Sequence, residues 1–279
     1  MLALVTGAGS GMGTEISRSL ARAGYEVIMA CRNMKQGLTA KEAILADTPG
    51  AVLDVREIDL SDLADVAAFA DRLLAEGRHI DRLMNNAGTL DAKQKFTVNG
   101  LDNNISVNYV GPYLLTRKLL PLMGNGSRIV NMASMVYRIG RIDFPEFFTK
   151  GCRGSYNRFK VYSNSKLAIT LFSLKLAGMV KDKGITVNAS DPGIVSTNII
   201  RMDNRVIDTL CDIFFRPVIY TPLQGASTAI DLLLNPQKAS QTGTFNKRSH
   251  PVRLGSGYTS HPMTDELWNR TEEIVKKLL

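Results

Sequence analysis

The chain has 279 residues, of which 44% are hydrophobic and 22% charged, and its formal net charge is +8. This length favours one large domain over residues 1–279, no run approaches the ~18 apolar residues of a membrane span, and the scattered Lys and Arg residues exclude the basic stripe typical of nucleic-acid binding. The few widely spaced cysteines and histidines indicate neither a disulfide framework nor a metal site, and no secretory signal precedes the first strand, so we expect a cytoplasmic protein.

An apolar strand at residues 2–5 leads directly into a glycine-rich loop. Residues 6–13 read Thr-Gly-Ala-Gly-Ser-Gly-Met-Gly, with glycines spaced as G-x-x-x-G-x-G, and a segment with helical spacing follows. A pyrophosphate binds against the backbone N–H groups of a helix N-terminus only where side chains are absent. These residues therefore predict a dinucleotide-binding unit with cofactor contacts from Gly7, Ser10, Gly11, Met12 and Gly13. A glycine-rich turn without a ligand is the alternative.

Six further apolar segments have the length of strands, and helical segments separate them. We expect strands near residues 27–30, 52–58, 80–84, 127–132, 185–189 and 243–246, and helices near residues 35–47, 61–74, 102–123, 162–180, 223–234 and 264–279. This alternation predicts an α/β fold with a single doubly wound (Rossmann) parallel sheet of about seven strands and helices on both faces. Ligands of such sheets bind at the carboxyl ends of the strands.

Two segments interrupt this alternation. Residues 135–159 contain several glycines, aromatic residues and arginines and are interpreted as a loop insertion. Residues 194–221 are irregular and apolar, with charged residues interspersed, which is typical of a mobile lid over an apolar substrate pocket. A helix packed permanently on the core, or a subunit interface, is the alternative for this second segment.

Small and polar residues follow the expected strands or lie on the expected helices. They are Asp59, Asn85-Asn86-Ala87-Gly88, Asn108, Ser134, Tyr162-Ser163-Asn164-Ser165-Lys166 and Pro192-Gly193 with Thr197. In this order, and together with the glycine loop, they resemble a classical short-chain dehydrogenase/reductase over roughly residues 1–246. Residues 108–116, 128–131 and 162–172 and the Leu267-Trp268 ending are most similar to the retinol-dehydrogenase-like branch of that family.

The resemblance implies a site with catalytic and cofactor-binding residues. The implied catalytic residues are Asn108, Ser134, Tyr162 and Lys166. The implied cofactor contacts, besides the glycine loop, are Asp59, Leu60, Asn86, Ala87, Gly88, Tyr162, Lys166, Pro192, Gly193, Val195 and Thr197. Simpler interpretations remain open: Asn86–Gly88 and Pro192-Gly193 as ordinary turns, Ser134 as a turn serine, Asn108 as a solvent-facing residue and Asp59 as a charge at a helix N-terminus.

The sequence also departs from the branch. Ala133 stands where a second serine is common, and Asp191 stands where a histidine often precedes Pro-Gly. The first strand begins at residue 2, so we expect no N-terminal membrane anchor of the kind usual in the branch. Because Asp191 replaces that histidine, the contacts between the Pro192-Gly193 turn and the cofactor are left open.

The chemistry of Tyr162 and Lys166 can be argued from the residues themselves. Reduction of a carbonyl needs a group that protonates the alkoxide, and a tyrosine has an unperturbed pKa of ~10. A lysine four residues on lies on the same helical face and lowers that pKa by its charge. Ser134 supplies a hydroxyl for the substrate oxygen, and Asn108 can open its helix locally and hold a water beside Lys166.

A second Tyr-x-x-x-Lys pattern, Tyr156 with Lys160, competes with the first. Six residues turn a helix by roughly 240°, so both pairs cannot face one cofactor from one helix. The small residues between Tyr162 and Lys166 favour that pair, because a cofactor can lie close to them.

The residues after the second strand predict the cofactor. An acidic residue there usually binds the ribose of NAD, but this chain has Cys31-Arg32-Asn33. Arg32 can hold a 2′-phosphate with two charge-assisted hydrogen bonds, which favours NADP(H); an exposed loop arginine is the alternative.

The sequence thus predicts an NADP(H)-dependent oxidoreductase that interconverts a carbonyl and an alcohol on a fairly bulky apolar small molecule. A non-catalytic cofactor-sensing protein of the same fold is the alternative. The resemblance favours a homodimer paired through the helices that carry Asn108 and Tyr162. A monomer is the alternative, because residues 135–159 could cover that helical face.

Overall fold

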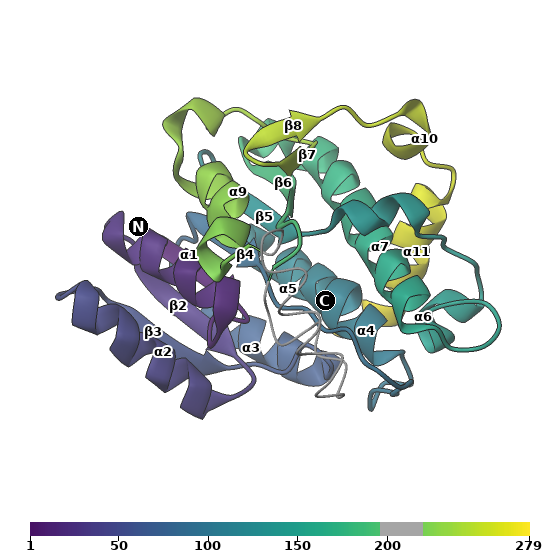
Figure 1. The fold of residues 1–279 in the computed structure, drawn as a ribbon, viewed down its shortest axis with the longest axis horizontal. Coiled ribbons are helices and arrows are strands. Elements are labelled where there is room, and N and C mark those ends of the chain that lie inside the picture. Colours follow the sequence, from purple (N-terminus) through teal and green to yellow (C-terminus); the bar gives the residue numbers. More distant parts are fainter. Residues whose placement is uncertain (196–219) are drawn as a thin grey trace.

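The computed structural model describes residues 1–195 and 220–279. One eight-stranded sheet organises the molecule, in the order β3-β2-β1-β4-β5-β6-β7-β8 (Figure 1). The strands are β1 Leu2–Thr6, β2 Glu26–Cys31, β3 Leu53–Glu57, β4 Arg82–Asn85, β5 Arg128–Met132, β6 Thr186–Asp191, β7 Thr244–Lys247 and β8 His250–Val252. The parallel, doubly wound sheet predicted from the sequence is confirmed. The eighth strand was not predicted: it pairs antiparallel with β7, and three residues that include Pro251 carry almost no strand signal.

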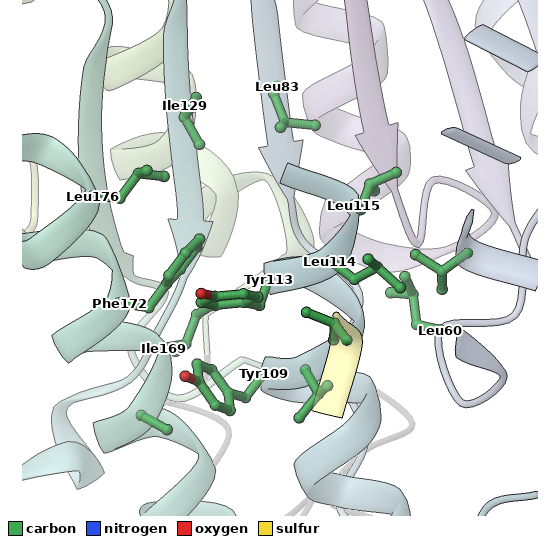
Figure 2. Close-up of a cluster of buried hydrophobic side chains, with 14 of the residues drawn as sticks. Leu60, Leu83, Tyr109, Tyr113, Leu114, Leu115, Ile129, Ile169, Phe172 and Leu176 are labelled. Atoms are coloured by element: carbon green, nitrogen blue, oxygen red, sulfur yellow. The ribbon is translucent and has the colours of Figure 1, made fainter. Parts of the chain in front are cut away.

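Helices cover both faces of the sheet because the central strands are apolar on both sides. Helices α1 Gly11–Arg22, α2 Met34–Asp47 and α9 Pro222–Leu234 pack on one face, against residues such as Val5 and Met29. Helices α3 Leu63–Glu76, α5 Gly111–Leu119 and α7 Arg158–Met179 pack on the other, where Leu4 and Ile129 lie. Figure 2 shows the aromatic centre of this second core around Tyr109, Tyr113 and Phe172.

The long helix expected over residues 102–123 is broken in the structure. Helix α4 Asn103–Ile105 passes into a π-helical turn, Ser106–Val110, before α5, and a 3₁₀ turn, Leu120–Leu122, ends the segment. Gly111 lies at the junction, where an added Cβ would be 2.6 Å from the carbonyl oxygen of Leu60. The wider turn places Asn108 on the inner side of the helix.

The segment interpreted as an insertion is packed on the fold. Residues 135–159 contain the 3₁₀ helix Met135–Ile139 and helix α6 Glu146–Lys150, and Tyr137, Phe147 and Phe148 are buried in the same core as α7. The chain ends in the short α10 Ser256–Thr259 and in α11 Met263–Val275, which lies beside α7 (Figure 1). Within the described residues, no helix is long and apolar enough to cross a membrane.

Candidate functional site

The glycine loop after β1 is shaped by its glycines. Gly7 and Gly11 have φ angles of +65° and +55°, in the left-handed region that favours glycine. A Cβ on Gly13 would lie 2.1 Å from the carbonyl oxygen of Gly7, so only glycine allows the first turn of α1 to approach the loop this closely. Ser10 precedes α1, and its side chain makes no capping hydrogen bond. The helix N-terminus is thus left open to a ligand.

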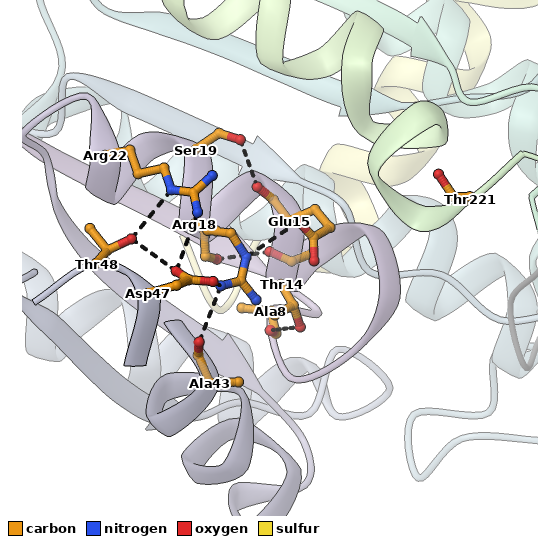
Figure 3. Close-up of polar contacts among 12 residues, drawn as sticks. Ala8, Thr14, Glu15, Arg18, Ser19, Arg22, Ala43, Asp47, Thr48 and Thr221 are labelled. Atoms are coloured by element: carbon orange, nitrogen blue, oxygen red, sulfur yellow. Dashed lines mark hydrogen bonds and ion pairs between the residues drawn. The ribbon is translucent and has the colours of Figure 1, made fainter. Parts of the chain in front are cut away.

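Contacts along α1 hold this loop in place (Figure 3). The Thr14 hydroxyl donates a hydrogen bond of 3.0 Å to the carbonyl oxygen of Ala8. Further along the helix, Arg18 forms an ion pair with Asp47 at the end of α2 and donates to the carbonyl oxygen of Ala43. The loop is therefore bonded to α1, and α1 in turn to the end of α2.

A cleft of about 450 Å³ opens at the carboxyl ends of β1, β2 and β4. Its lining includes these predicted cofactor contacts: Gly7, Ser10, Gly11, Met12, Arg32, Asp59, Leu60, Asn86, Ala87 and Gly88. Sequence reasoning missed Cys31, Ile58, Thr89 and Val107, which also line it. The first three adjoin predicted residues, so the strand ends could have indicated them; Val107 could not be placed without the π-helical turn.

The turn after β4 is attached to the glycine loop. The Thr6 hydroxyl accepts the N–H groups of Asn86 and Ala87 at 3.0 and 3.1 Å. The Asn86 side-chain amide donates to the carbonyl oxygens of Thr6 and Gly7. Its amide oxygen, Oδ1, is buried and has no partner among the described residues, so an acceptor remains available to a ligand. Thr6 was not among the predicted site residues.

Asn108 is buried rather than solvent-facing, at 2% exposure. Its Oδ1 accepts the N–H of Thr89 at 2.7 Å, and its Nδ2 donates to the carbonyl oxygen of Thr89 at 2.9 Å and to the Ser165 hydroxyl at 3.0 Å. Asn108 therefore ties the loop after β4 to α7. Gly88 lies between Asn108 and Lys166: a Cβ added to Gly88 would be 3.3 Å from Asn108 Oδ1 and 3.7 Å from Lys166 Nζ.

Tyr162 and Lys166 lie together on α7. The Lys166 ammonium is 5.4 Å from the centroid of the Tyr162 ring and donates a 2.8 Å hydrogen bond to the carbonyl oxygen of Met132, at the end of β5. Burial lowers the pKa of Lys166 to about 8. Burial, with a smaller contribution from the Asp191 carboxylate, raises the pKa of Tyr162 to about 12. Tyr162 therefore carries its proton at neutral pH.

The competing tyrosine, Tyr156, has a different environment. It precedes α7, donates a 2.7 Å hydrogen bond to the carbonyl oxygen of Asp91 and accepts one from the Asn104 amide. Lys160 is exposed. Tyr156 fastens residues 135–159 to the loop before α4. Neither Tyr156 nor Tyr162 is among the residues that line the cleft, but Lys166, the partner of Tyr162, lies beside Gly88, which does line it.

Ser134 begins the 3₁₀ helix that follows β5. Its hydroxyl accepts the N–H of Val136 at 3.5 Å, and the next residue, Met135, donates its N–H to the Asp191 carboxylate at 2.9 Å. Ser134 is thus half-buried in a turn attached to the end of β6.

The Pro192-Gly193 turn continues from β6. Gly193 has a φ angle of +72°, and a Cβ there would lie 2.8 Å from the Tyr220 ring. Val195 is buried and forms an isolated parallel bridge with Tyr220. Thr197 and most of the lid expected over residues 194–221 lie outside the described residues.

The far end of the cleft contains one basic and one acidic predicted residue. Arg32 is exposed, and no ion pair found among the described residues involves it. The Asp59 carboxylate accepts the N–H and the hydroxyl of Ser61 at 2.9 and 2.7 Å. The N-cap of α3 is Asp62, whose side chain accepts the N–H of Ala64.

Comparisons with known proteins identify the family of the chain. The model of the short chain dehydrogenase family matches residues 1–206. Retinol dehydrogenase 12 of Bos taurus is 32% identical over 274 residues, which cover 98% of this chain and 85% of the relative. Retinol dehydrogenase 11 of Mus musculus is 35% identical over 250 residues, covering 87% and 76%.

Solved structures share the fold. A protein from Mycobacterium paratuberculosis, 28% identical, superposes with a TM-score of 0.77 over 99% of this chain and 93% of that one. A short chain dehydrogenase from Burkholderia cenocepacia, solved in complex with NADP, has a TM-score of 0.69 at 24% identity and covers 87% and 94% of the two chains. The chain belongs to the short-chain dehydrogenase/reductase family of oxidoreductases, in its retinol-dehydrogenase-like branch.

Proposed function

We propose that this enzyme uses NADP(H) to interconvert a carbonyl and an alcohol on a fairly bulky apolar substrate, with Tyr162 as the acid/base. The observation that carries the proposal is the position of the Tyr162–Lys166 pair. Lys166 Nζ lies beside Gly88, which lines the cleft, and is bonded to the end of β5. The Tyr162 ring lies 5.4 Å from this ammonium, and the nearness of this pair to a lining residue supports a proton donor and a cation beside the cleft.

The residues of the cleft fit a dinucleotide. Gly7, Gly11 and Gly13 carry no side chains around the α1 N-terminus, which suits a pyrophosphate, and Asn86 Oδ1 is a buried acceptor without a partner among the residues that the structure describes. In our proposal Asp59 and Leu60 bind the adenine end. The turns at residues 86–88 and 192–195, Thr197, Tyr162 and Lys166 hold the other end. When bound, the nicotinamide supplies hydride transfer.

Arg32 supports the choice of NADP(H). Its guanidinium lies at the cleft, is exposed and has no carboxylate partner among the described residues, so a 2′-phosphate can take that place.

The proton chemistry follows from the environment of Tyr162. Because burial keeps the hydroxyl protonated, it can donate a proton to the substrate oxygen as the carbonyl is reduced, and it recovers that proton from solvent. Ser134 donates a hydrogen bond to the same oxygen and orients it. Lys166 keeps a positive charge close to Tyr162, which favours the tyrosinate needed for the reverse reaction.

Two observations support a bulky apolar substrate. Residues 194–221 combine many apolar residues with a few charged ones in the sequence. The curated relatives carry the name retinol dehydrogenase, and retinol is a long apolar alcohol.

A substrate screen tests this function. Purified protein is incubated with aldehydes, ketones and alcohols, from small polar compounds to long apolar ones, with each of the two nicotinamide cofactors, and cofactor absorbance is followed. We expect turnover of the apolar compounds. Cofactor binding without consumption of any compound would show a sensor, and turnover of small polar compounds alone would contradict the apolar pocket.

A further inference from the structure

Asp191 is a buried acidic residue at the reaction site that none of the roles above uses. It is the last residue of β6, is 4% exposed and directly precedes the Pro192-Gly193 turn. Most buried carboxylates need a partner to offset the loss of hydration. The partners of Asp191 are therefore informative.

The first partner is the turn that carries Ser134. Asp191 Oδ1 accepts the N–H of Met135 at 2.9 Å, whereas the Ser134 hydroxyl reaches the N–H of Val136 only at 3.5 Å. The carboxylate is thus the shorter and stronger cap of this 3₁₀ helix. Because Ala133 also donates its N–H to the carbonyl oxygen of Ser190, the residues on both sides of Ser134 are bound to the end of β6.

The second set of partners is charged or titratable. Lys166 Nζ donates to the carbonyl oxygen of Met132, and Met132 pairs with Ser190, the residue directly before Asp191. The Tyr162 ring centroid lies 5.4 Å from Lys166 Nζ, and Lys247 on β7 pairs with Asp191 in the sheet. Burial raises the pKa of Asp191, and the N–H groups of Met135 and Gly193 and the charges of Lys247 and Lys166 oppose this rise. When ionised, the carboxylate favours the protonated state of Tyr162 and Lys166.

We propose that Asp191 is a positioning residue of the reaction site: its carboxylate holds the turn that presents Ser134 and places a negative charge beside the Tyr162–Lys166 pair. The second part rests on the proposed function, since it assigns an effect on the proton chemistry of Tyr162. Neutralising Asp191 favours proton loss from Lys166 and Tyr162. In the pH profile of kcat/KM, neutralising Asp191 therefore moves the descending limb for reduction to lower pH. It moves the ascending limb for oxidation in the same direction.

Asp191→Asn separates the two effects. The amide oxygen still accepts the Met135 N–H, but the charge is gone, so we expect an intact fold and a descending limb at least about half a pH unit lower than in the wild type. Asp191→Ala removes both the acceptor for the Met135 N–H and the negative charge. We expect a further loss of kcat of about tenfold, with an unchanged Kd for NADPH. Asp81→Asn is the matched control. The Asp81 carboxylate also accepts a backbone N–H, that of Leu2, but at the amino ends of β1 and β4, away from the reaction site.

A titration without cofactor or substrate gives an independent readout. The ¹³Cε resonance of Lys166 is assigned as the one lost in Lys166→Arg, and its titration midpoint is compared between the wild type and Asp191→Asn. We expect a lower midpoint in the variant and no change in Asp81→Asn. Equal midpoints, or pH profiles that coincide, would overturn the proposal. Failure to turn over any substrate would refute the proposed function instead, while the titration would still decide the role of Asp191.

Discussion

At the scale of single residues, Tyr162 and Tyr156 begin the same pattern but have different surroundings. Tyr162→Phe removes the proton donor and keeps the ring, so we predict a fall in kcat of at least ~10²-fold. Tyr156→Phe removes the hydrogen bond to Asp91 and should change kcat less than about threefold, with a loss of about 0.5–1.5 kcal/mol in the free energy of unfolding. Steady-state kinetics and urea denaturation measure both; the reverse pattern would move the site to Tyr156.

The pH dependence of reduction should report Lys166. Its pKa is about 8, and that of Tyr162 is about 12, so raising the pH removes the lysine charge first. The sign follows from the roles. Reduction needs the protonated tyrosine, and the charged lysine stabilises the tyrosinate that forms when Tyr162 gives up its proton; both states are lost as pH rises. We predict that kcat/KM for reduction is level near neutral pH and falls above about pH 8. In Lys166→Arg, the residual activity should lack this fall, because arginine stays charged; a fall at the same pH in both proteins would exclude Lys166 as its origin.

The cofactor preference depends on Arg32. We predict at least ~tenfold higher kcat/KM with NADP(H) than with NAD(H), a difference of about 1.4 kcal/mol. Arg32→Ala should remove most of that preference, because the contact to the 2′-phosphate is lost. Arg22→Ala, at the other end of α1, is the control and should leave the ratio unchanged. Equal efficiencies in the wild type would contradict the assignment of Arg32.

At the scale of elements, the π-helical turn matters because it places Asn108 between two segments. Asn108→Leu has a similar shape but leaves the N–H and carbonyl of Thr89 and the Ser165 hydroxyl without this partner. We predict a loss of about 2 kcal/mol or more in the free energy of unfolding, since buried polar groups are left unpaired. Denaturation in urea measures it, and an unchanged midpoint would show that the loop after β4 is held by other contacts.

At the scale of the whole molecule, α11 occupies the surface through which a homodimer was expected. Trp268 packs against Tyr113 of α5 and Phe172 of α7, and Glu272 binds both the Tyr113 hydroxyl and Arg117. A second subunit could reach this face of α5 and α7 only if α11 moved away.

We therefore predict a monomer by light scattering at micromolar concentration. Truncation after Pro262 should expose the apolar residues beneath α11 and produce dimers or larger species. A wild-type dimer that persists after truncation would place the subunit interface on another surface.

Local sequence determined the parts of this protein that depend on neighbouring residues. The glycine loop, the apolar strands of the parallel sheet and the Tyr162–Lys166 spacing each follow from a short pattern, because a turn, a buried strand and one helical face are set within a few residues. These patterns were sufficient to predict the sheet and most of the cleft lining.

Only the tertiary structure decided which of these residues meet. Lys166 bonds to Met132, 34 residues away, and Asn108 to Ser165, 57 residues away, while Asp191 caps a turn 56 residues earlier in the chain. Sheet order and helix packing create these contacts, and no periodicity in the sequence encodes them. For the same reason, the sequence did not predict the short antiparallel strand β8 or the packing of α11 over α5 and α7, and it did not settle the burial of Asn108.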